Sequence, residues 1–203
     1  MQMLEQLLGG DKMNFTAEMA RKWLILFDEK IQAKQDYLSE LDTPIGDGDH
    51  GHNMARGMSA VVAVLNDDQS LQEVFKATAM ALISKVGGAS GPLYGTAFME
   101  MAKVAATSDD LSSLLAAGLV GIIKRGGAQV GDKTMVDVWT PILAEIQKGS
   151  LTKIEIDEVV MATADLLAKK GRASYVGERS IGHIDPGSQS SGYLFESLLE
   201  VLG

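Results

Sequence analysis

Hydrophobic side chains recur at helical spacing along most of the chain, and the clearest stripe runs through residues 16–41. Apolar positions there repeat at intervals of three and four residues, and charged side chains fill the positions between them. The stripe is formed by Ala20, Trp23, Leu24, Phe27, Ile31, Leu38 and Leu41. Because this spacing places the apolar side chains on one face of a helix, it predicts a long amphipathic helix.

Seven further segments show the same period, and several of them carry helix-start signals. Ser70 and Glu73 have the spacing of a capping box. Pro92 suits the first position of a helix, and Asp110 suits the position before one. The seven helices are expected to begin near Met54, after Ser70, at Pro92, after Asp110, near Thr134, after Thr152 and near Ser188. The last three are expected to end near Gln147, Gly171 and Leu202.

No segment has a convincing strand pattern, so the sequence predicts an all-α fold. Short connectors, such as 66–69 and 149–152, favour antiparallel neighbours. We therefore expect a single domain over residues 1–203, with eight antiparallel helices in an up-and-down ring or bundle. Residues 1–15 precede the first stripe, and we expect them to be attached only loosely.

One connection, residues 171–187, has neither a helical nor a strand period. Its length exceeds the roughly 12 to 15 residues that are usual for a structureless connection. It carries Arg172, Arg179, His183 and Asp185 together with apolar and aromatic residues, a composition unlike that of a disordered linker. This pattern indicates a functional loop.

The composition of the chain indicates which classes of protein it can belong to. A chain of 203 residues that is 46% hydrophobic suits one well-buried core. Its 18 Lys and Arg against 27 Asp and Glu give a net charge of -9, whereas nucleic acid or an acidic membrane would call for a basic face. No apolar stretch reaches the roughly 18 residues of a membrane span, and no leader pattern opens the chain. With no cysteine, the chain is expected to be a soluble cytoplasmic protein.

Three carboxylates lie close together in the stretch LDTPIGDGDHGHN, which begins at Leu41. Asp42, Asp47 and Asp49 are interleaved with glycines, whose backbone freedom lets the acidic side chains converge. Three like charges repel unless water or a cation separates them. Oxygen ligands favour Mg²⁺, which is typically bound by a few carboxylates together with substrate phosphates. The alternative is an ordinary solvated turn, because Asp-Gly pairs are common turn formers.

Two glycine-rich motifs are misleading. Residues 46–51 match G-x-G-x-x-G, but a helical pattern precedes them instead of the strand that a dinucleotide-binding turn requires. Residues 126–134 approach a P-loop, but Asp132 intrudes before Lys133 and again no strand leads in. We interpret neither as a phosphate loop.

Two helix starts favour an anion close to the acidic cluster. Residues 87–92 open a helix after a loop of small residues, and residues 49–53 open another. Free N–H groups and the positive end of the helix dipole attract phosphate there. Arg172 from the 171–187 loop offers a guanidinium that suits phosphate. His50, His52 and His183, taken singly, are expected to form structural hydrogen bonds.

Four stretches resemble signature segments of the ADP-binding L subunits of dihydroxyacetone kinases. They are LDTPIGDGDHGHNMARG, VGGASGPLYGT, RGGAQVGDKTMVDVW and GRASYVGERSIGHIDPGS. The resemblance covers about residues 16–203. It implies an antiparallel ring of eight helices with ADP or ATP bound tightly at one end.

The resemblance also implies roles for particular residues. Two Mg²⁺ ions would be held by Asp42, Asp47 and Asp49. The nucleotide would be contacted by His50, Gly51, His52, Asn53, Ala89, Ser90, Gly126, Met135, Arg172, Asp185, Pro186 and Gly187. No side chain would act as a nucleophile, because phosphoryl transfer asks mainly for positioning and charge neutralisation.

The length of the chain suits the variant of this family that works as a separate subunit. In that variant, bound ADP takes a phosphoryl group from an M subunit, a phosphocarrier of the phosphoenolpyruvate-dependent sugar phosphotransferase system. It passes the group to dihydroxyacetone (glycerone) held covalently on a K subunit. Two alternatives remain open: an ATP-dependent kinase of glycerone or a related polyol, and a non-enzymatic partner of a transcription regulator.

Overall fold

The structure, a computed structural model, describes residues 14–203. Within this part of the chain there are eight α-helices and two 3₁₀ segments, and no strand beyond an isolated bridge between Asn14 and Asp110. The α-helices are α2 (Ala17–Asp42), α3 (His50–Val62), α4 (Leu71–Lys85), α5 (Ser90–Ala105), α6 (Leu111–Gly126), α7 (Val136–Lys148), α8 (Lys153–Ala162) and α9 (Pro186–Leu202). The 3₁₀ segments are η1 (Thr163–Asp165) and η2 (Arg172–Ser180). The expected all-α fold is confirmed.

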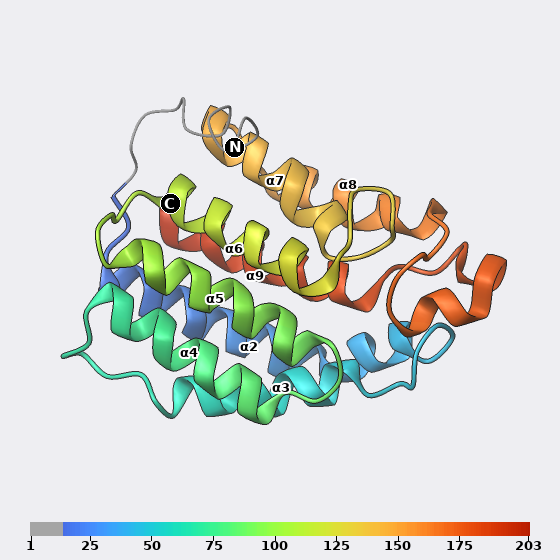
Figure 1. Ribbon diagram of the computed structural model, residues 1–203, viewed down its shortest axis with the longest axis horizontal. Coiled ribbons are helices and arrows are strands. Elements are labelled where there is room, and N and C mark those ends of the chain that lie inside the picture. The colour runs from blue at the N-terminus through green and yellow to red at the C-terminus, as the bar shows by residue number, and fades with distance from the viewer. Residues whose placement is uncertain (1–13) are drawn as a thin grey trace.

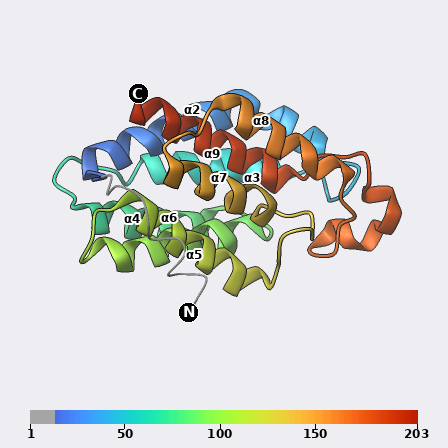
Figure 2. The ribbon, with the colours of Figure 1, turned by 90° about the horizontal axis from the view of Figure 1, so that it is seen from above.

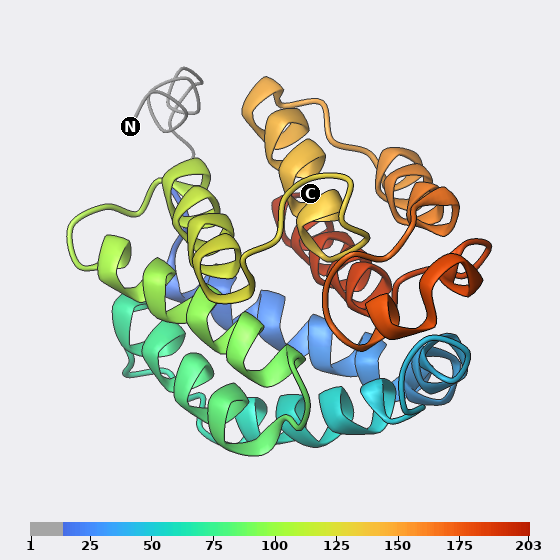
Figure 3. The same ribbon diagram turned by 45° about the vertical axis from the view of Figure 1, so that its right-hand side comes forward.

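The helices form a closed ring. Each one packs against the next in sequence, and α9 packs against α2 to complete the circuit (Figures 1 and 3). Successive helices run in opposite directions along the long axis of the molecule, and η2 lies beyond the helix ends (Figure 2). None of the helices in the described part is long and apolar enough to cross a membrane.

Side-chain caps explain where many of the helices begin. The Ser70 hydroxyl accepts from the Glu73 N–H while the Glu73 carboxylate accepts from the Ser70 N–H, so the expected capping box is present. Thr152 and Glu155 form a second capping box before α8. Such caps contribute about 1 kcal/mol each, because they satisfy N–H groups that have no partner inside the helix.

Trp23 on α2 lies at the centre of the core. Its ring meets Phe15, Phe75 and Phe98, and its indole Nε1 donates to the carbonyl of Leu194 over 2.7 Å. These contacts join α2 to α4, α5 and α9. Phe15 is fully buried, although it falls in the segment 1–15 that was expected to be loosely attached; residues 1–13 of that segment lie outside the described residues.

The segment 163–187 differs from the sequence expectation. The helix expected to reach Gly171 ends at Ala162. The carbonyls of Thr163, Ala164 and Leu166, which a longer helix would use internally, instead accept from the Lys133 ammonium. Within the expected irregular loop, η2 forms short 3₁₀ turns interrupted at Gly177. Turns this short leave no recognisable hydrophobic period.

Candidate functional site

Four loops gather at one end of the ring, because the helices alternate in direction. The loops 43–49, 86–89, 127–135 and 163–185 connect the C-terminal ends of α2, α4, α6 and α8 to the N-terminal ends of α3, α5, α7 and α9 (Figure 1). Each helix N-terminus carries N–H groups without a partner inside the helix and a partial positive charge of about half an elementary charge. This end of the molecule is therefore suited to an anion.

A cavity of about 420 Å³ opens among these loops. Its volume falls in the range of small-molecule sites, roughly 300 to 1,000 Å³. One group of lining residues is apolar: Ile45, Pro92, Leu93, Ile122, Ala128, Met135 and Val136. Another is basic: Arg125, Lys133, Lys170 and Arg172. The acidic residues on its wall include Asp42, Asp47 and Asp49.

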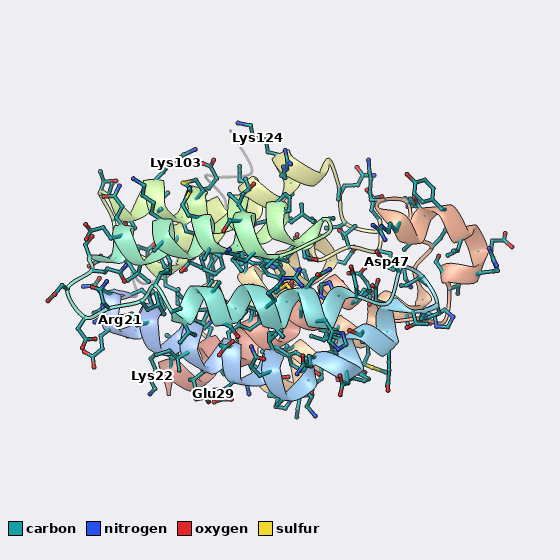
Figure 4. All side chains as sticks on the ribbon, turned by 90° about the horizontal axis from the view of Figure 1, so that it is seen from below. Arg21, Lys22, Glu29, Asp47, Lys103 and Lys124 are labelled. Carbon is teal, nitrogen blue, oxygen red and sulfur yellow. The ribbon has the colours of Figure 1, made fainter. Side chains whose placement is uncertain are left out.

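The three carboxylates of the acidic cluster converge. Asp42, Asp47 and Asp49 each offer an oxygen atom, and these atoms lie within 4.8 Å of one another. Asp42 is held in place because its Oδ2 accepts from the backbone N–H of Asp49 (3.0 Å) and His50 (3.3 Å). The same contacts cap the start of α3, so one side chain fixes both the helix and the cluster. Figure 4 shows Asp47 at this end of the molecule.

The cluster fits a divalent cation. Its donors are all carboxylate oxygens, the set that Mg²⁺ prefers. Asp47 and Asp49 are exposed, so an ion can reach them. The guanidinium of Arg172 forms an ion pair with Asp47 at the edge of the cluster.

His50 is a buried histidine on the wall of the cavity. Burial lowers the pKa of its imidazole to about 4, although the nearby Asp42 and Asp49 carboxylates act in the opposite direction. The ring is therefore neutral at pH 7. Its Nδ1 lies 3.1 Å from Ser90 Oγ and its Nε2 lies 3.0 Å from Ser190 Oγ. His50 thus ties α3 to α5 and α9 through hydrogen bonds, in keeping with the structural role expected for the histidines taken singly.

Asn53 is oriented by a neighbour outside the cavity. Arg56 Nη2 donates to Asn53 Oδ1 over 2.6 Å, and Arg56 Nε donates to the carbonyl of Lys85. Since a guanidinium only donates, the amide nitrogen of Asn53 keeps its two hydrogens for other acceptors. A Cβ on Gly87 would lie about 3 Å from the atoms of this amide, so the glycine leaves room for it. Asn53 can present donors to an anion in the cavity.

Most of the residues expected at the nucleotide line the cavity. They are His50, Asn53, Ala89, Ser90, Gly126, Met135, Arg172, Asp185, Pro186 and Gly187. Gly51 and His52 do not. Gly51 faces the backbone of Gln35 on α2, and the imidazole of His52 bonds Ser39 (2.8 Å) and approaches Asp36 (3.5 Å). A role for these two at the nucleotide stays a prediction.

Sequence reasoning missed the part that Lys133 plays. This lysine is almost fully buried and has a left-handed backbone angle, φ 61°. Its Nζ donates to the carbonyls of Thr163 (2.7 Å), Ala164 (3.3 Å) and Leu166 (3.2 Å), and burial lowers its pKa. The signal in the sequence was the incomplete P-loop motif, but the lysine bonds backbone carbonyls and fixes the loop after α8.

Replacing Lys133 with methionine should lower the free energy of unfolding by about 3 kcal/mol, because buried carbonyls lose their charged donor. Lys169→Met is the matched control. Lys169 bonds the neighbouring Gly131 carbonyl, yet its side chain is exposed, so we expect a loss below about 1 kcal/mol. Urea denaturation of both variants measures the difference. Equal losses would contradict the anchoring role of Lys133.

Asp185 makes the stability of the folded protein depend on pH. Its Oδ2 accepts from the N–H (2.7 Å) and hydroxyl (2.9 Å) of Ser188 and so caps α9. Burial raises the pKa of this carboxyl to about 6, against the opposing effects of Ser188 and Lys133. The folded protein therefore binds this proton more tightly than the unfolded chain does. Its contribution to stability is present at low pH and is lost as the pH rises from about 4 to about 6.

Asp185→Asn should remove that dependence, because asparagine keeps the capping oxygen without the charge. We expect the free energy of unfolding of the variant, relative to that of the wild type, to rise as the pH is raised from 4 to 6. Above pH 6 the difference between the two proteins should stay constant. Denaturation curves at four pH values across this window measure it. If the stabilities of variant and wild type ran parallel with pH, the raised pKa of Asp185 would be wrong.

The sequence and the fold were compared with those of known proteins. Residues 44–200 match the family model described as DAK2 domain. The chain is 59% identical to the "PTS-dependent dihydroxyacetone kinase, ADP-binding subunit DhaL" of Lactococcus lactis, over 92% of this chain and 98% of that one. It is 39% identical to the "PEP-dependent dihydroxyacetone kinase, ADP-binding subunit DhaL" of Escherichia coli, over 87% and 92% of the two chains.

Among solved structures, the fold is similar to the dihydroxyacetone kinase of C. freundii, with a TM-score of 0.73 and 23% identity. The match covers 95% of this chain and 36% of that longer one. A second structure of the C. freundii enzyme is described as a complex with AMP-PNP and Mg²⁺. The resemblance read from the four sequence stretches is confirmed, and the chain belongs to the DAK2 domain family.

Proposed function

We propose that this chain is the ADP-binding subunit of a phosphoenolpyruvate-dependent dihydroxyacetone kinase. Bound ADP accepts a phosphoryl group from a phosphocarrier M subunit and passes it to dihydroxyacetone held on a K subunit, which yields dihydroxyacetone phosphate. The observation that carries the proposal is that an acidic cluster, helix N-termini and an apolar wall meet in one cavity. A nucleoside diphosphate with Mg²⁺ needs these three surfaces together.

Each part of the nucleotide is assigned to the surface of the cavity that suits its chemistry. The base is apolar on its faces and suits the wall that includes Leu93, Ile122 and Met135. The phosphates suit the N-terminus of α5 at Ser90 and the donors of Asn53. Arg172 and the segment 185–187 also line the cavity, and we assign them to closing over the nucleotide.

Two Mg²⁺ ions belong to the acidic cluster in this proposal. Asp42, Asp47 and Asp49 would hold them, and bound Mg²⁺ would offset negative charge on the phosphates. Arg172, which pairs with Asp47 in this structure, is close enough to the cluster to turn to a phosphate oxygen instead. Because Asp42 is fixed by the start of α3, it keeps a constant position relative to Asn53 on the first turn of that helix.

The protein's own contribution to the reaction is positioning. The hydroxyl of Ser90 lies beside the neutral His50 in the cavity, and we assign this pair to holding the nucleotide and not to nucleophilic attack. Phosphoryl transfer needs an aligned donor and acceptor and compensation of charge more than it needs a covalent side-chain intermediate. The substrate is therefore expected to come from the partner subunit, and this chain holds the nucleotide that serves both transfers.

The test uses the subunit loaded with ADP. Adding phosphorylated M subunit should convert the bound ADP to bound ATP, which ³¹P NMR detects directly. Addition of K subunit and dihydroxyacetone should then restore ADP and release dihydroxyacetone phosphate. Turnover with free ATP in the absence of the phosphocarrier would contradict the proposal and favour the ATP-dependent kinase. Nucleotide binding without transfer in either assay would favour a non-enzymatic partner of a transcription regulator.

A further inference from the structure

A chain of buried hydrogen bonds leads from the core to the cavity. Trp139 Nε1 lies 3.1 Å from Ser191 Oγ, which lies 2.9 Å from the hydroxyl of Tyr94. That hydroxyl lies 2.8 Å from Ser190 Oγ, which lies 3.0 Å from His50 Nε2. On the far side of the imidazole, Nδ1 faces Ser90 Oγ. The chain joins α7, α9, α5 and α3, and its last member lines the cavity.

The first steps of the chain have a defined direction. An indole N–H only donates, so Ser191 accepts from Trp139. Tyr94 is the remaining partner of the Ser191 hydroxyl among the described contacts, so Ser191 donates to Tyr94. The hydrogen of Tyr94 then goes to Ser190. Burial raises the pKa of Tyr94 far above its usual value, so the phenol keeps its proton.

The direction divides at Ser190. Its hydrogen has two acceptors within reach, His50 Nε2 at 3.0 Å and the carbonyl of Gly187 at 3.1 Å. Donation to Nε2 keeps all the dipoles aligned from head to tail, an arrangement in which successive hydrogen bonds polarise and strengthen one another. Donation to Gly187 would make the bonds from Tyr94 and His50 converge on one oxygen and end the alignment.

We propose that this chain of hydrogen bonds leaves Nε2 of His50 as an acceptor and places the ring proton on Nδ1, so that Ser90 accepts from His50 and keeps its own hydroxyl hydrogen to donate into the cavity. Ser190, Tyr94 and Ser191 are then positioning residues, since they set the tautomer of a ring that orients a donor at the phosphate end of the site. The functional part of the inference rests on the proposed function, because it takes the anion at Ser90 to be a nucleotide phosphate. The tautomer does not depend on it.

The tautomer is measured directly. Long-range ¹H–¹⁵N correlation spectra at pH 7, with the histidines ¹⁵N-labelled, distinguish a protonated ring nitrogen from an unprotonated one. We expect His50 to carry its proton on Nδ1 in the wild-type protein, and Ser190→Ala to move at least part of the population to Nε2. A wild-type ring protonated on Nε2 would overturn the proposal, whether or not the protein binds nucleotide.

The consequence for binding is measured by calorimetry with ADP and Mg²⁺. Ser190→Ala should weaken ADP binding by roughly fivefold to tenfold, the effect of one lost hydrogen bond, because Ser90 then donates to His50 instead. Ser197→Ala is the matched control, since Ser197 is equally buried on α9 but donates to the Tyr193 carbonyl, away from His50. Ser190→Thr should restore both the tautomer and the affinity.

The experiments test the tautomer of His50 separately from its effect on ADP binding. Equal ADP affinities for Ser190→Ala and Ser197→Ala would overturn the link from tautomer to binding. If the wild-type protein bound no ADP, the proposed function would fail while the spectrum of His50 would still decide the tautomer. Tyr94→Phe adds a second point in the chain, and it should shift the tautomer in the same direction as Ser190→Ala but by less, because Ser190 keeps its hydrogen.

Discussion

Replacing Asp47 with alanine should reduce phosphoryl transfer by about a thousandfold or more and leave the helical ring intact. Asp47 lies in the exposed loop 43–49, where its carboxylate contributes to the acidic cluster and pairs with Arg172. Its side chain packs into no part of the core, so its loss costs little stability. Rates of transfer from the phosphocarrier to bound ADP, with circular dichroism as a check on the fold, measure the effect.

Asp36→Ala is the control for this experiment. Asp36 is an exposed carboxylate on α2 that approaches His52, and it does not line the cavity. The same loss of charge there should leave the transfer rate within about twofold of the wild type. Full turnover of Asp47→Ala with Mg²⁺ would mean that the assignment of the metal to the acidic cluster is wrong.

Replacing Gly51 with alanine should lower the free energy of unfolding by about 3 kcal/mol and weaken nucleotide binding as well. A Cβ at this position would lie 1.8 Å from the carbonyl oxygen of Gln35 and 2.9 Å from Ser39 Oγ. The obstacle is the backbone of α2, which cannot rotate away as a side chain can. The start of α3 would have to move, and Asp49 and His50 would move with it relative to Asp42.

Gly126→Ala provides the comparison for Gly51→Ala. Gly126 is the last residue of α6, and a Cβ there would meet only the tip of Leu93 at 3.2 Å. A flexible side chain can give way, and alanine favours a helix over glycine by about 1 kcal/mol. Its stability should therefore equal or slightly exceed that of the wild type. Thermal unfolding of both variants would contradict the close approach of α2 and α3 if their midpoints were the same.

The helices could be foreseen because their determinants are local. The apolar stripe from Ala20 to Leu38 and the capping box at Ser70 depend only on spacing along the chain. The end of α8 could not be foreseen in this way. It is set by Lys133, about thirty residues earlier in the sequence, which draws the carbonyls of Thr163 and Leu166 to its ammonium. A contact between distant residues leaves no trace in a hydrophobic period.

The same distinction applies to the site. The acidic cluster lies within eight residues of sequence, so residue chemistry alone left two interpretations, a cation site or a solvated turn. Arg172 and the segment 185–187 were assigned to the nucleotide through the family resemblance, and the structure brings them to the same cavity. Leu93 and Ile122 were indistinguishable from core residues of their helices, because the sequence does not say which apolar side chains face a cavity.

The second layer of the site was also beyond sequence reasoning. Arg56 orients Asn53 from the exposed side of α3, and Ser190 reaches His50 from the other end of the chain. Neither residue type at its position is unusual. Arg56 acquires its role because Asn53, three residues earlier on α3, lines the cavity, and Ser190 acquires its role because the ring brings the N-termini of α3, α5 and α9 to one end of the molecule.

Native mass spectrometry tests the central claim, that the acidic cluster and the cavity together hold a nucleotide through Mg²⁺. The protein is purified without added nucleotide, and its mass is measured before and after dialysis against excess EDTA. We expect the mass of the chain plus ADP and two Mg²⁺ before dialysis, and loss of the nucleotide only when the metal is removed. A chain that carries no nucleotide and binds none when ADP and Mg²⁺ are added would contradict the account.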